Sequence, residues 1–407
     1  MKSIRAIYKI GKGPSSSHSM GPAKAAGIFI QGLPADDLHI KVILYDSLAA
    51  TGKGHYTDKA IREALLPLSV EFEWRYETTL FFHPNAMDFI AFNEQGLVVK
   101  EWRVYSVGGG LLCDNNGPVD LENIIDYPDN SFQELFKFCK KENIALWEYI
   151  KRFDDSSIWP YLENIWKVMK EGIERGLEIK EGILPGPLKL QRRANQMLKF
   201  ANRRIGSLRD RNLLSSYALS LAEENATGGT VVTAPTCGSC GVLPAILYFF
   251  WQHYDTDIVS LTKALAVAGL VGSTVVENAS ISGAEVGCQG EIGVACSMAA
   301  AAATFLLNGS NEQIEYAAEM GLEHFLGLTC DPIAGLVQVP CIERNAFAAM
   351  RAMDCAAYAL ATEGSHLVSL DDVIGVMNDT GKDLQSKYRE TSRGGLAAIM
   401  RNSFCLD

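Results

Sequence analysis

Alternating apolar and polar positions dominate the first part of the chain and predict β-strands there. Because successive side chains of a strand point to opposite faces, a period of two indicates a strand with one buried face. Three stretches follow this pattern: 38–45, 70–76 and 97–107. Between them, helical segments are plausible over 21–31 and 57–66, and Asp58 lies near the start of the second, where a negative charge favours a helix. The pattern predicts a compact α+β domain over residues 1 to about 115.

The pattern changes beyond residue 116. Turns rich in Asp, Asn and Pro come first, followed by charged amphipathic segments at 132–139 and 145–152. From about residue 190 onward, Ala- and Gly-rich helical segments follow one another: 214–224, 261–275, 295–307 and 312–325. Their largely apolar character predicts helices buried against other helices. We therefore expect an α+β N-terminal domain with its connector over residues 1–150, and a mainly α-helical domain over residues 151–407.

Composition and charge narrow the class of protein. The chain has 407 residues, 48% apolar and 21% charged, which is typical of a globular protein with a substantial core. A net charge of −11 argues against a general nucleic-acid binder. One basic run, 192–211, holds seven basic residues against one acid, and we interpret it as a solvated helix face.

Nothing near the N-terminus resembles a signal peptide. The longest nearly uncharged runs, 264–276 and 294–307, are shorter than the roughly 18–20 residues that cross a bilayer. We expect a cytoplasmic protein without a membrane partner, in which these runs form core helices.

Ten cysteines are many for a reducing compartment, and a disulfide framework is not expected in so long a chain without an export signal. Three lie at breaks in the helical pattern, where a ligand side chain is plausible: Cys288 between glycines, Cys330 before Asp-Pro and Cys341 after a proline. Cys296 opens an Ala-rich helix and is expected to be a packing residue. The spacings match neither zinc fingers nor ferredoxins. Spacing alone leaves metal binding and buried thiols equally open.

Nine motifs, spread over nearly the whole chain, resemble the iron–sulfur-dependent L-serine dehydratase family and occur in the family's order. They are PSSSHSMGP (14–22), SLAATGKGH (47–55), FFHPNAM (81–87), YSVGGG (105–110), LPGPLKLQRRA (184–194), VVTAPTCGSCGVLPAIL (231–247), GAEVGCQGEIGVACSMAAA (283–301), CDPIAGLVQVPCIERNA (330–346) and ETSRGGLA (390–397). So many matches in order make a chance resemblance implausible.

The resemblance implies a fold, a cofactor and a reaction. The small N-terminal domain would be related to an allosteric-substrate-binding fold and would precede a helical catalytic domain. By motif, Cys288, Cys330 and Cys341 would hold a [4Fe–4S] cluster. One iron would then lack a cysteine and could act as a Lewis acid on L-serine, which would be converted to pyruvate and ammonia. A homodimer is also implied.

The reaction needs a base for the α-proton and donors for the substrate carboxylate. Three histidines fall inside the motifs, and we rank His55 first, His83 second and His18 third as acid/base groups. His39 and His253 are interpreted as structural. Hydroxyls and backbone N–H groups in the Gly- and Ser-rich motifs are the expected substrate contacts: Ser15, Ser16, Ser17, Ser106, Gly108 and Thr236.

Two further features concern cysteines outside the proposed ligand set. Cys237 and Cys240 replace part of an Asn-Gly-Ala-Ala-Gly run that many family members carry, and we interpret them as small residues packed at a Gly-rich turn. Cys405 lies third from the end. Some relatives place a C-terminal cysteine on the open iron, so Cys405 is a candidate fourth ligand or inhibitory tail, although a mobile tail thiol is the simpler expectation.

Three other functions remain as alternatives. A pyridoxal-phosphate enzyme needs a Schiff-base lysine and a phosphate loop, yet Lys53 is the one tempting motif lysine and the Gly-rich segment 228–241 has none. No pyridoxal phosphate is therefore expected. A cysteine desulfidase could use a similar helical domain. A non-catalytic iron–sulfur redox sensor is the alternative from another class, and the acidic charge without a DNA-binding motif disfavours it.

Overall fold

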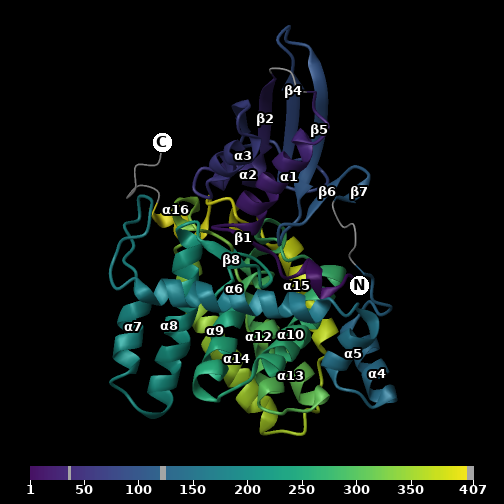
Figure 1. The fold of residues 1–407 in the computed structure, drawn as a ribbon, viewed down its shortest axis with the longest axis vertical. Helices are drawn as coiled ribbons and strands as arrows, with labels where there is room; N and C mark the ends of the chain where they lie inside the picture. Colours follow the sequence, from purple (N-terminus) through teal and green to yellow (C-terminus); the bar gives the residue numbers. More distant parts are fainter. Residues whose placement is uncertain (35–37, 120–124, 401–407) are drawn as a thin grey trace.

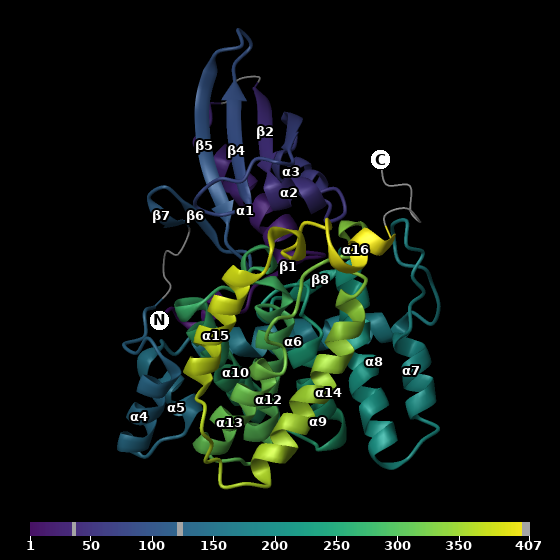
Figure 2. The ribbon, with the colours of Figure 1, turned by 180° about the vertical axis from the view of Figure 1, so that it is seen from behind.

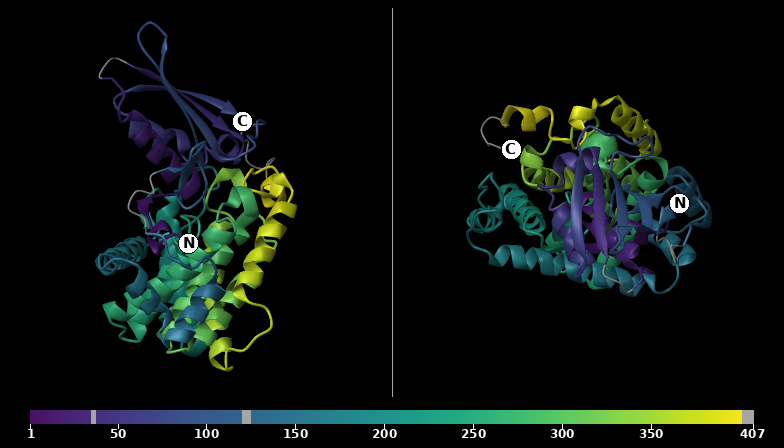
Figure 3. Two further views of the ribbon diagram at one scale, coloured as in Figure 1. Left: turned by 90° about the vertical axis from the view of Figure 1, so that its right-hand side faces the viewer. Right: turned by 90° about the horizontal axis from the view of Figure 1, so that it is seen from above.

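The chain folds into a small sheet-containing domain seated on one end of a larger helical domain (Figures 1 and 3). The computed structural model describes residues 1–34, 38–119 and 125–400. The predicted fold class, an α+β domain followed by a mainly α-helical one, is confirmed.

The small domain is built on one mixed sheet with the strand order β3-β2-β4-β5-β6-β7. Its strands are β2 (His39–Tyr45), β3 (Ser69–Arg75), β4 (Ala86–Phe92), β5 (Val98–Ser106), β6 (Leu112–Asp114) and β7 (Gly117–Val119). Strand β2 is parallel to β3 and antiparallel to β4. Alternate side chains of β2, such as Ile40 and Val42, share a buried cluster with Phe29 of helix α1 (Gly21–Ile30) and Ile61 of α3 (Thr57–Leu65). The period-two pattern therefore arises from one helix-covered face of the sheet.

A second, two-stranded sheet joins the N-terminal arm to the helical domain. Strand β1 (Ile10–Lys12) pairs antiparallel with β8 (Thr230–Val232), with Ile10 opposite Val232. Figure 1 shows this pair lying between the two domains. Tyr8, just before β1, is fully buried in the helical core and its hydroxyl donates to the Leu265 carbonyl at 2.8 Å. The arm thereby fixes how the small domain sits on the large one.

The centre of the helical domain is mostly apolar. Its helices are α4 (Phe132–Glu142), α5 (Leu146–Phe153), α6 (Ile158–Glu178), α7 (Ala194–Ala201), α8 (Gly206–Ala226), α9 (Val242–His253), α10 (Ile258–Asn278), α11 (Gly283–Val286), α12 (Ile292–Leu306), α13 (Asn311–Glu323), α14 (Cys341–Leu360), α15 (Leu370–Asp383) and α16 (Gly395–Met400). Figure 2 shows α10 and α12 among the other helices, and almost every side chain of α12 is buried. A helix surrounded in this way is apolar on most sides, and its two buried hydroxyls, on Ser297 and Thr304, donate to backbone carbonyls.

Helix α10 is longer than the uncharged run that predicts it. Among the described residues it is the one unbent helix long and apolar enough to cross a bilayer, and 78% of that stretch is buried inside the fold. A pair of helices bent by 51°, Gly283–Gln289 with Ile292–Leu306, passes the same test only if taken together. Buried core helices commonly have this composition, so these segments are weak evidence for a membrane span.

The connector helices α4 and α5 also pack into the large helical core, through residues such as Leu135 and Tyr149. The proposed boundary at residue 150 stays a prediction.

Candidate functional site

A small, largely enclosed cavity lies where the small domain meets the helical domain, and residues of both domains line it. Its walls come from segments that are far apart in the sequence. They are Ser15, His55, Gly238, Cys288, Glu291, Ile292, Cys330, Pro332, Val337, Cys341 and Glu390. All three cysteines that the motifs single out line this cavity, together with one of the three motif histidines.

The three cysteines are presented by short turns. Cys288 lies in a single 3₁₀ turn after α11, Cys330 precedes a loop, and Cys341 is the first residue of α14. The Sγ atoms of Cys288 and Cys330 lie 3.7 and 3.9 Å from the same oxygen, Glu291 Oε2. The backbone of Cys330 also pairs with the C-terminal segment, because the Glu390 N–H donates to its carbonyl at 2.7 Å. The fold thus gathers two thiols and two carboxyl groups from three segments, 288–291, 330 and 390.

Burial and the neighbouring acidic groups raise the pKa values of the thiols and carboxyl groups in this cavity. Hydrogen bonding with Cys288, followed by burial, raises the pKa of Cys330, and burial followed by Cys288 raises that of Cys341. Burial, followed by the charge of Glu291, raises the pKa of Glu390 well above its usual range. A group of thiols and carboxyls that burial and mutual repulsion keep protonated is stabilised when a cation replaces the protons. The donor set therefore fits a metal centre with thiolate ligands.

Gly283 leaves room between the Cys330 thiol and the carboxyl groups of Glu291 and Glu390. A Cβ on Gly283, at the start of α11, would lie 2.9 Å from Glu291 Oε2 and 3.1 Å from both Cys330 Sγ and Glu390 Oε2. A side chain at this position would require all three of these atoms to shift, so glycine leaves them room to lie close together.

Gly283→Ala is expected to lower iron incorporation, and turnover with it, because the added methyl group displaces the Cys330 thiol and the carboxyl groups of Glu291 and Glu390. Iron content after anaerobic reconstitution measures the effect. Gly375→Ala in α15 is the matched control, since its Cβ would meet nothing within 4 Å. The control should load fully and lose no stability, because alanine favours a helix by about 1 kcal/mol over glycine. A fully loaded and active Gly283→Ala protein would contradict this role of Gly283.

His55 is held with a lone pair toward the cavity. Its Nδ1 lies 3.0 Å from the Thr51 hydroxyl, and that hydroxyl donates its own hydrogen to the Ser47 carbonyl at 3.0 Å. Thr51 must therefore accept, which assigns the imidazole hydrogen to Nδ1. Nε2 is buried without a hydrogen-bond partner among the described residues, and burial lowers the pKa of His55 to about 3. A neutral imidazole with a free Nε2 is equipped to accept a proton.

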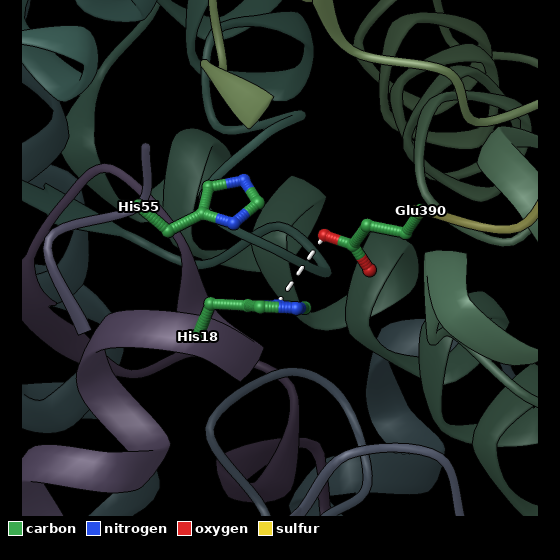
Figure 4. Close-up of side chains that lie close together, drawn as sticks. All are labelled: His18, His55 and Glu390. Carbon is green, nitrogen blue, oxygen red and sulfur yellow. Dashed lines mark ion pairs between the residues drawn. The ribbon is translucent and has the colours of Figure 1, made fainter. Parts of the chain in front are cut away.

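Hydrogen bonds also fix the tautomer of His18, but its hydrogen is on Nε2 instead of Nδ1. Its Nε2 lies 3.1 Å from the Ser47 hydroxyl, which donates to the Glu390 carbonyl at 2.9 Å, so Nε2 carries the hydrogen. Its Nδ1 faces the Ser17 hydroxyl at 2.9 Å and Glu390 Oε1 at 3.4 Å. Figure 4 shows His18 and His55 side by side facing Glu390, and the two ring centroids are 4.5 Å apart. Burial, then the neighbouring His55, keeps the pKa of His18 well below its usual value.

His83 occupies a different cavity, with Phe82, Glu285 and Arg389. Its Nδ1 accepts the Asn85 N–H at 3.0 Å, so its Nε2 carries the hydrogen and faces Glu285 at 3.4 Å. Nδ1 is thereby committed, whereas Nε2 makes no hydrogen bond among the described residues. This geometry fits a positioning role between the small domain and α11, and the acid/base role of His83 stays a prediction.

Of the six predicted substrate contacts, Ser15 lines the cavity and the other five do not. Ser15 lines the cavity and accepts the His18 N–H at 3.1 Å, and Thr236 lies beside Glu291, whose carboxyl group it contacts. Ser16 is buried against Cys237, and Ser17 contacts His18. Ser106 and Gly108 do not line the cavity: Ser106 packs against Gly21, while Gly108, at φ 98°, approaches the backbone of Ser282.

The motifs contain two functional candidates that the sequence reasoning missed, Glu291 and Glu390. An acid three residues after Cys288 and one at the head of ETSRGG were the available signals. Cys237 and Cys240 are fully buried, and the Cys237 thiol lies 3.2 Å from Met20 Sδ, as expected for packing residues. Cys405 lies outside the described residues.

Comparisons with known proteins agree along nearly the full length. The family model described as serine dehydratase alpha chain matches residues 93–397, and that of serine dehydratase beta chain matches 3–71 and 66–117. The L-serine dehydratase of Streptomyces coelicolor is 40% identical, with 97% of this chain and 98% of the relative covered. L-serine dehydratase TdcG of Escherichia coli is 41% identical over 96% and 97%. The L-serine dehydratase of Helicobacter pylori strain 26695 is 37% identical over 98% and 99%.

Proposed function

The chain belongs to the serine dehydratase family in its single-chain form, and from this premise we propose that it converts L-serine to pyruvate and ammonia with a [4Fe–4S] cluster held by Cys288, Cys330 and Cys341. The observation that supports this most directly is that three buried thiols and the free Nε2 of His55 line one enclosed cavity. When bound, a cluster with three thiolate ligands would supply an open iron that acts as a Lewis acid on the substrate oxygens.

His55 takes the α-proton of L-serine in this proposal. Thr51 fixes its tautomer, so that Nε2 is always the accepting atom. The electron pair of the Cα–H bond forms the new C=C bond, and the hydroxyl leaves with the C–O pair, which gives 2-aminoacrylate. That product tautomerises and hydrolyses to pyruvate and ammonia. Positioned proton transfer of this kind contributes about 10²–10⁴-fold to a rate.

Glu390 donates the second proton of the reaction in this proposal, and His18 positions its carboxyl group. The leaving hydroxide needs a proton to depart as water, and the raised pKa of Glu390 keeps one on its carboxyl group inside the same cavity. His18 Nδ1, 3.4 Å from Glu390 Oε1, orients that carboxyl group. The Ser15 hydroxyl, which also lines the cavity, is a donor suited to the substrate carboxylate.

Side-by-side turnover of L-serine and L-cysteine under anaerobic conditions tests the substrate. We expect pyruvate and ammonia in equal amounts from L-serine, and slower release of sulfide from L-cysteine. Faster sulfide release would favour a desulfidase. A sharp yellow band removed by hydroxylamine, in place of a broad brown absorption lost in air, would favour pyridoxal phosphate.

A homodimer, a cytoplasmic location and the absence of nucleic-acid partners belong to the same proposal. They rest on the family resemblance and on the net charge of −11. Equilibrium sedimentation of the reconstituted chain measures the first of these.

A further inference from the structure

His18, His55 and Glu390 form a second group of side chains that could hold a metal ion, apart from the three cysteines. One nitrogen of each histidine and one carboxylate oxygen lie within 4.8 Å of one another, and all three residues are buried. The histidines come from the small domain and the glutamate from the C-terminal segment, and Figure 4 shows the three side chains facing one another. Two imidazoles and one carboxylate are a ligand set of mononuclear zinc sites.

Hydrogen bonds leave one lone pair on each imidazole directed to this group. Thr51 keeps the hydrogen of His55 on Nδ1, and the Ser47 hydroxyl keeps that of His18 on Nε2. The lone pairs of His55 Nε2 and His18 Nδ1 therefore remain for a ligand. Metal-binding histidines commonly donate their other N–H group to an oxygen atom, because that bond holds the ring in place. The supporting hydrogen bonds of a metal site are thus already formed.

Two atoms of the group are buried without a partner. Among the described residues, neither His55 Nε2 nor Glu390 Oε2 makes a hydrogen bond. Buried polar atoms in folded proteins are seldom left unpaired, so each such atom needs an explanation. Both belong to the same three-residue group, and a cation bound there would satisfy both.

The spacing of the other two ligand atoms fits a small tetrahedral ion. His18 Nδ1 lies 3.4 Å from Glu390 Oε1. Two atoms bound to one Zn²⁺ at about 2.1 Å and at a tetrahedral angle are about 3.4 Å apart. His18 Nδ1 also faces the Ser17 hydroxyl at 2.9 Å, and that hydroxyl has Ser15 Oγ 3.3 Å away as a second acceptor. Ser17 can therefore turn to Ser15 when a metal takes the lone pair of His18.

The ligand atoms select the kind of ion. Imidazole nitrogens suit zinc, whereas Mg²⁺ and Ca²⁺ prefer shells made of oxygen atoms. The group contains no thiol, and the other possible set of metal ligands, Cys288, Glu291 and Cys330, shares no residue with it. A zinc ion bound by the histidines and Glu390 would therefore have nitrogen and oxygen ligands from the protein and no sulfur.

We propose that His18, His55 and Glu390 form an inhibitory site for one Zn²⁺ ion. The ion takes the lone pair of His55 Nε2 and the carboxylate of Glu390, and the proton of Glu390 passes to solvent. These two groups are the base and the acid of the proposed reaction, so turnover stops while the ion is bound. Zinc binding rests on these three residues alone, whereas the inhibition rests on the proposed function.

Zinc content after dialysis, together with X-ray absorption at the zinc edge, tests the site in the iron-loaded chain. We expect one zinc per chain, with nitrogen and oxygen ligands at about 2.0–2.2 Å and no sulfur at about 2.3 Å. His18→Gln and Glu390→Gln should each weaken zinc binding by about tenfold or more, because each removes one ligand. His39→Gln is the matched control, since His39 also faces a glutamate, Glu71 at 3.5 Å, but on the exposed side of β2. The control should bind zinc as the parent does.

Equal zinc binding by the parent and both ligand variants would overturn the site, as would a first shell that contains sulfur or the absence of bound zinc. If the chain turns over L-serine, we expect zinc to inhibit the parent and His39→Gln, a chelator to restore activity without loss of iron, and Mg²⁺ to have no effect. Unchanged turnover with zinc at the site would overturn the inhibition. A chain that binds zinc through nitrogen and oxygen but forms no pyruvate without zinc would refute the proposed function alone.

Discussion

Replacing Cys330 by serine is expected to remove the iron centre and to reduce pyruvate formation from L-serine below detection. A serine hydroxyl does not ionise near neutral pH, whereas thiolates are the ligands that iron–sulfur clusters require. Three cysteines line the cavity, and if they hold the proposed cluster, losing one leaves it without sufficient support. Iron and sulfide content after anaerobic reconstitution, together with the brown absorption, measures the loss.

Two controls separate this effect from a general sensitivity to cysteine loss. Cys113→Ser alters a half-buried residue of β6, and Cys296→Ala alters a packing residue of α12; both lie outside the cavity. Each should keep full iron content. A Cys330→Ser protein that retains the cluster and the activity would show that the three-cysteine assignment is wrong.

His55→Gln is expected to lower kcat for L-serine by about 10²–10⁴-fold while leaving the iron content unchanged. Glutamine cannot accept the α-proton, but it fits the space and can still contact Thr51. His39→Gln, on the exposed side of β2, is the matched control and should turn over normally. Thr51→Val provides a second variant, since it keeps the imidazole and removes the group that fixes its tautomer. A smaller loss of kcat is expected there.

The pH dependence of kcat/KM follows from the pKa of His55. Burial lowers the pKa of His55 to about 3, so the neutral form that accepts a proton is present above that pH and is lost only as the pH falls toward 3. Between pH 8 and 5, kcat/KM should show no decline due to this group. An unchanged kcat in His55→Gln would eliminate His55 as the base.

Local sequence patterns predicted the elements whose sequences show a clear period. Strands β2, β3 and β5 and helices α1 and α3 lie within a residue or two of the predicted ranges. Strand β4 was missed because most of its residues are buried on both faces, which removes the alternation. The pair β1–β8 was missed because three residues are too few to show a period.

The site was predictable only as far as the motifs reached. The cysteines and His55 could be named from their motifs, but their meeting in one cavity depends on contacts between residues hundreds of positions apart. Glu390 shows the limit best: it contacts His18 and pairs with Cys330 through the tertiary fold, and no local period could reveal either contact. His83 shows another limit, since its motif placed it among the catalytic candidates and only the fold shows that it lines a different cavity from the three cysteines.

Anaerobic reconstitution of the chain with iron and sulfide, followed by a pyruvate assay with L-serine, tests the central claim most directly. We predict about four irons per chain, a broad brown absorption, and pyruvate formation that disappears when air destroys the cluster. A fully loaded cluster without any pyruvate from L-serine would contradict the claim and favour a redox sensor. Pyruvate formation at full rate by the iron-free chain would contradict it as well.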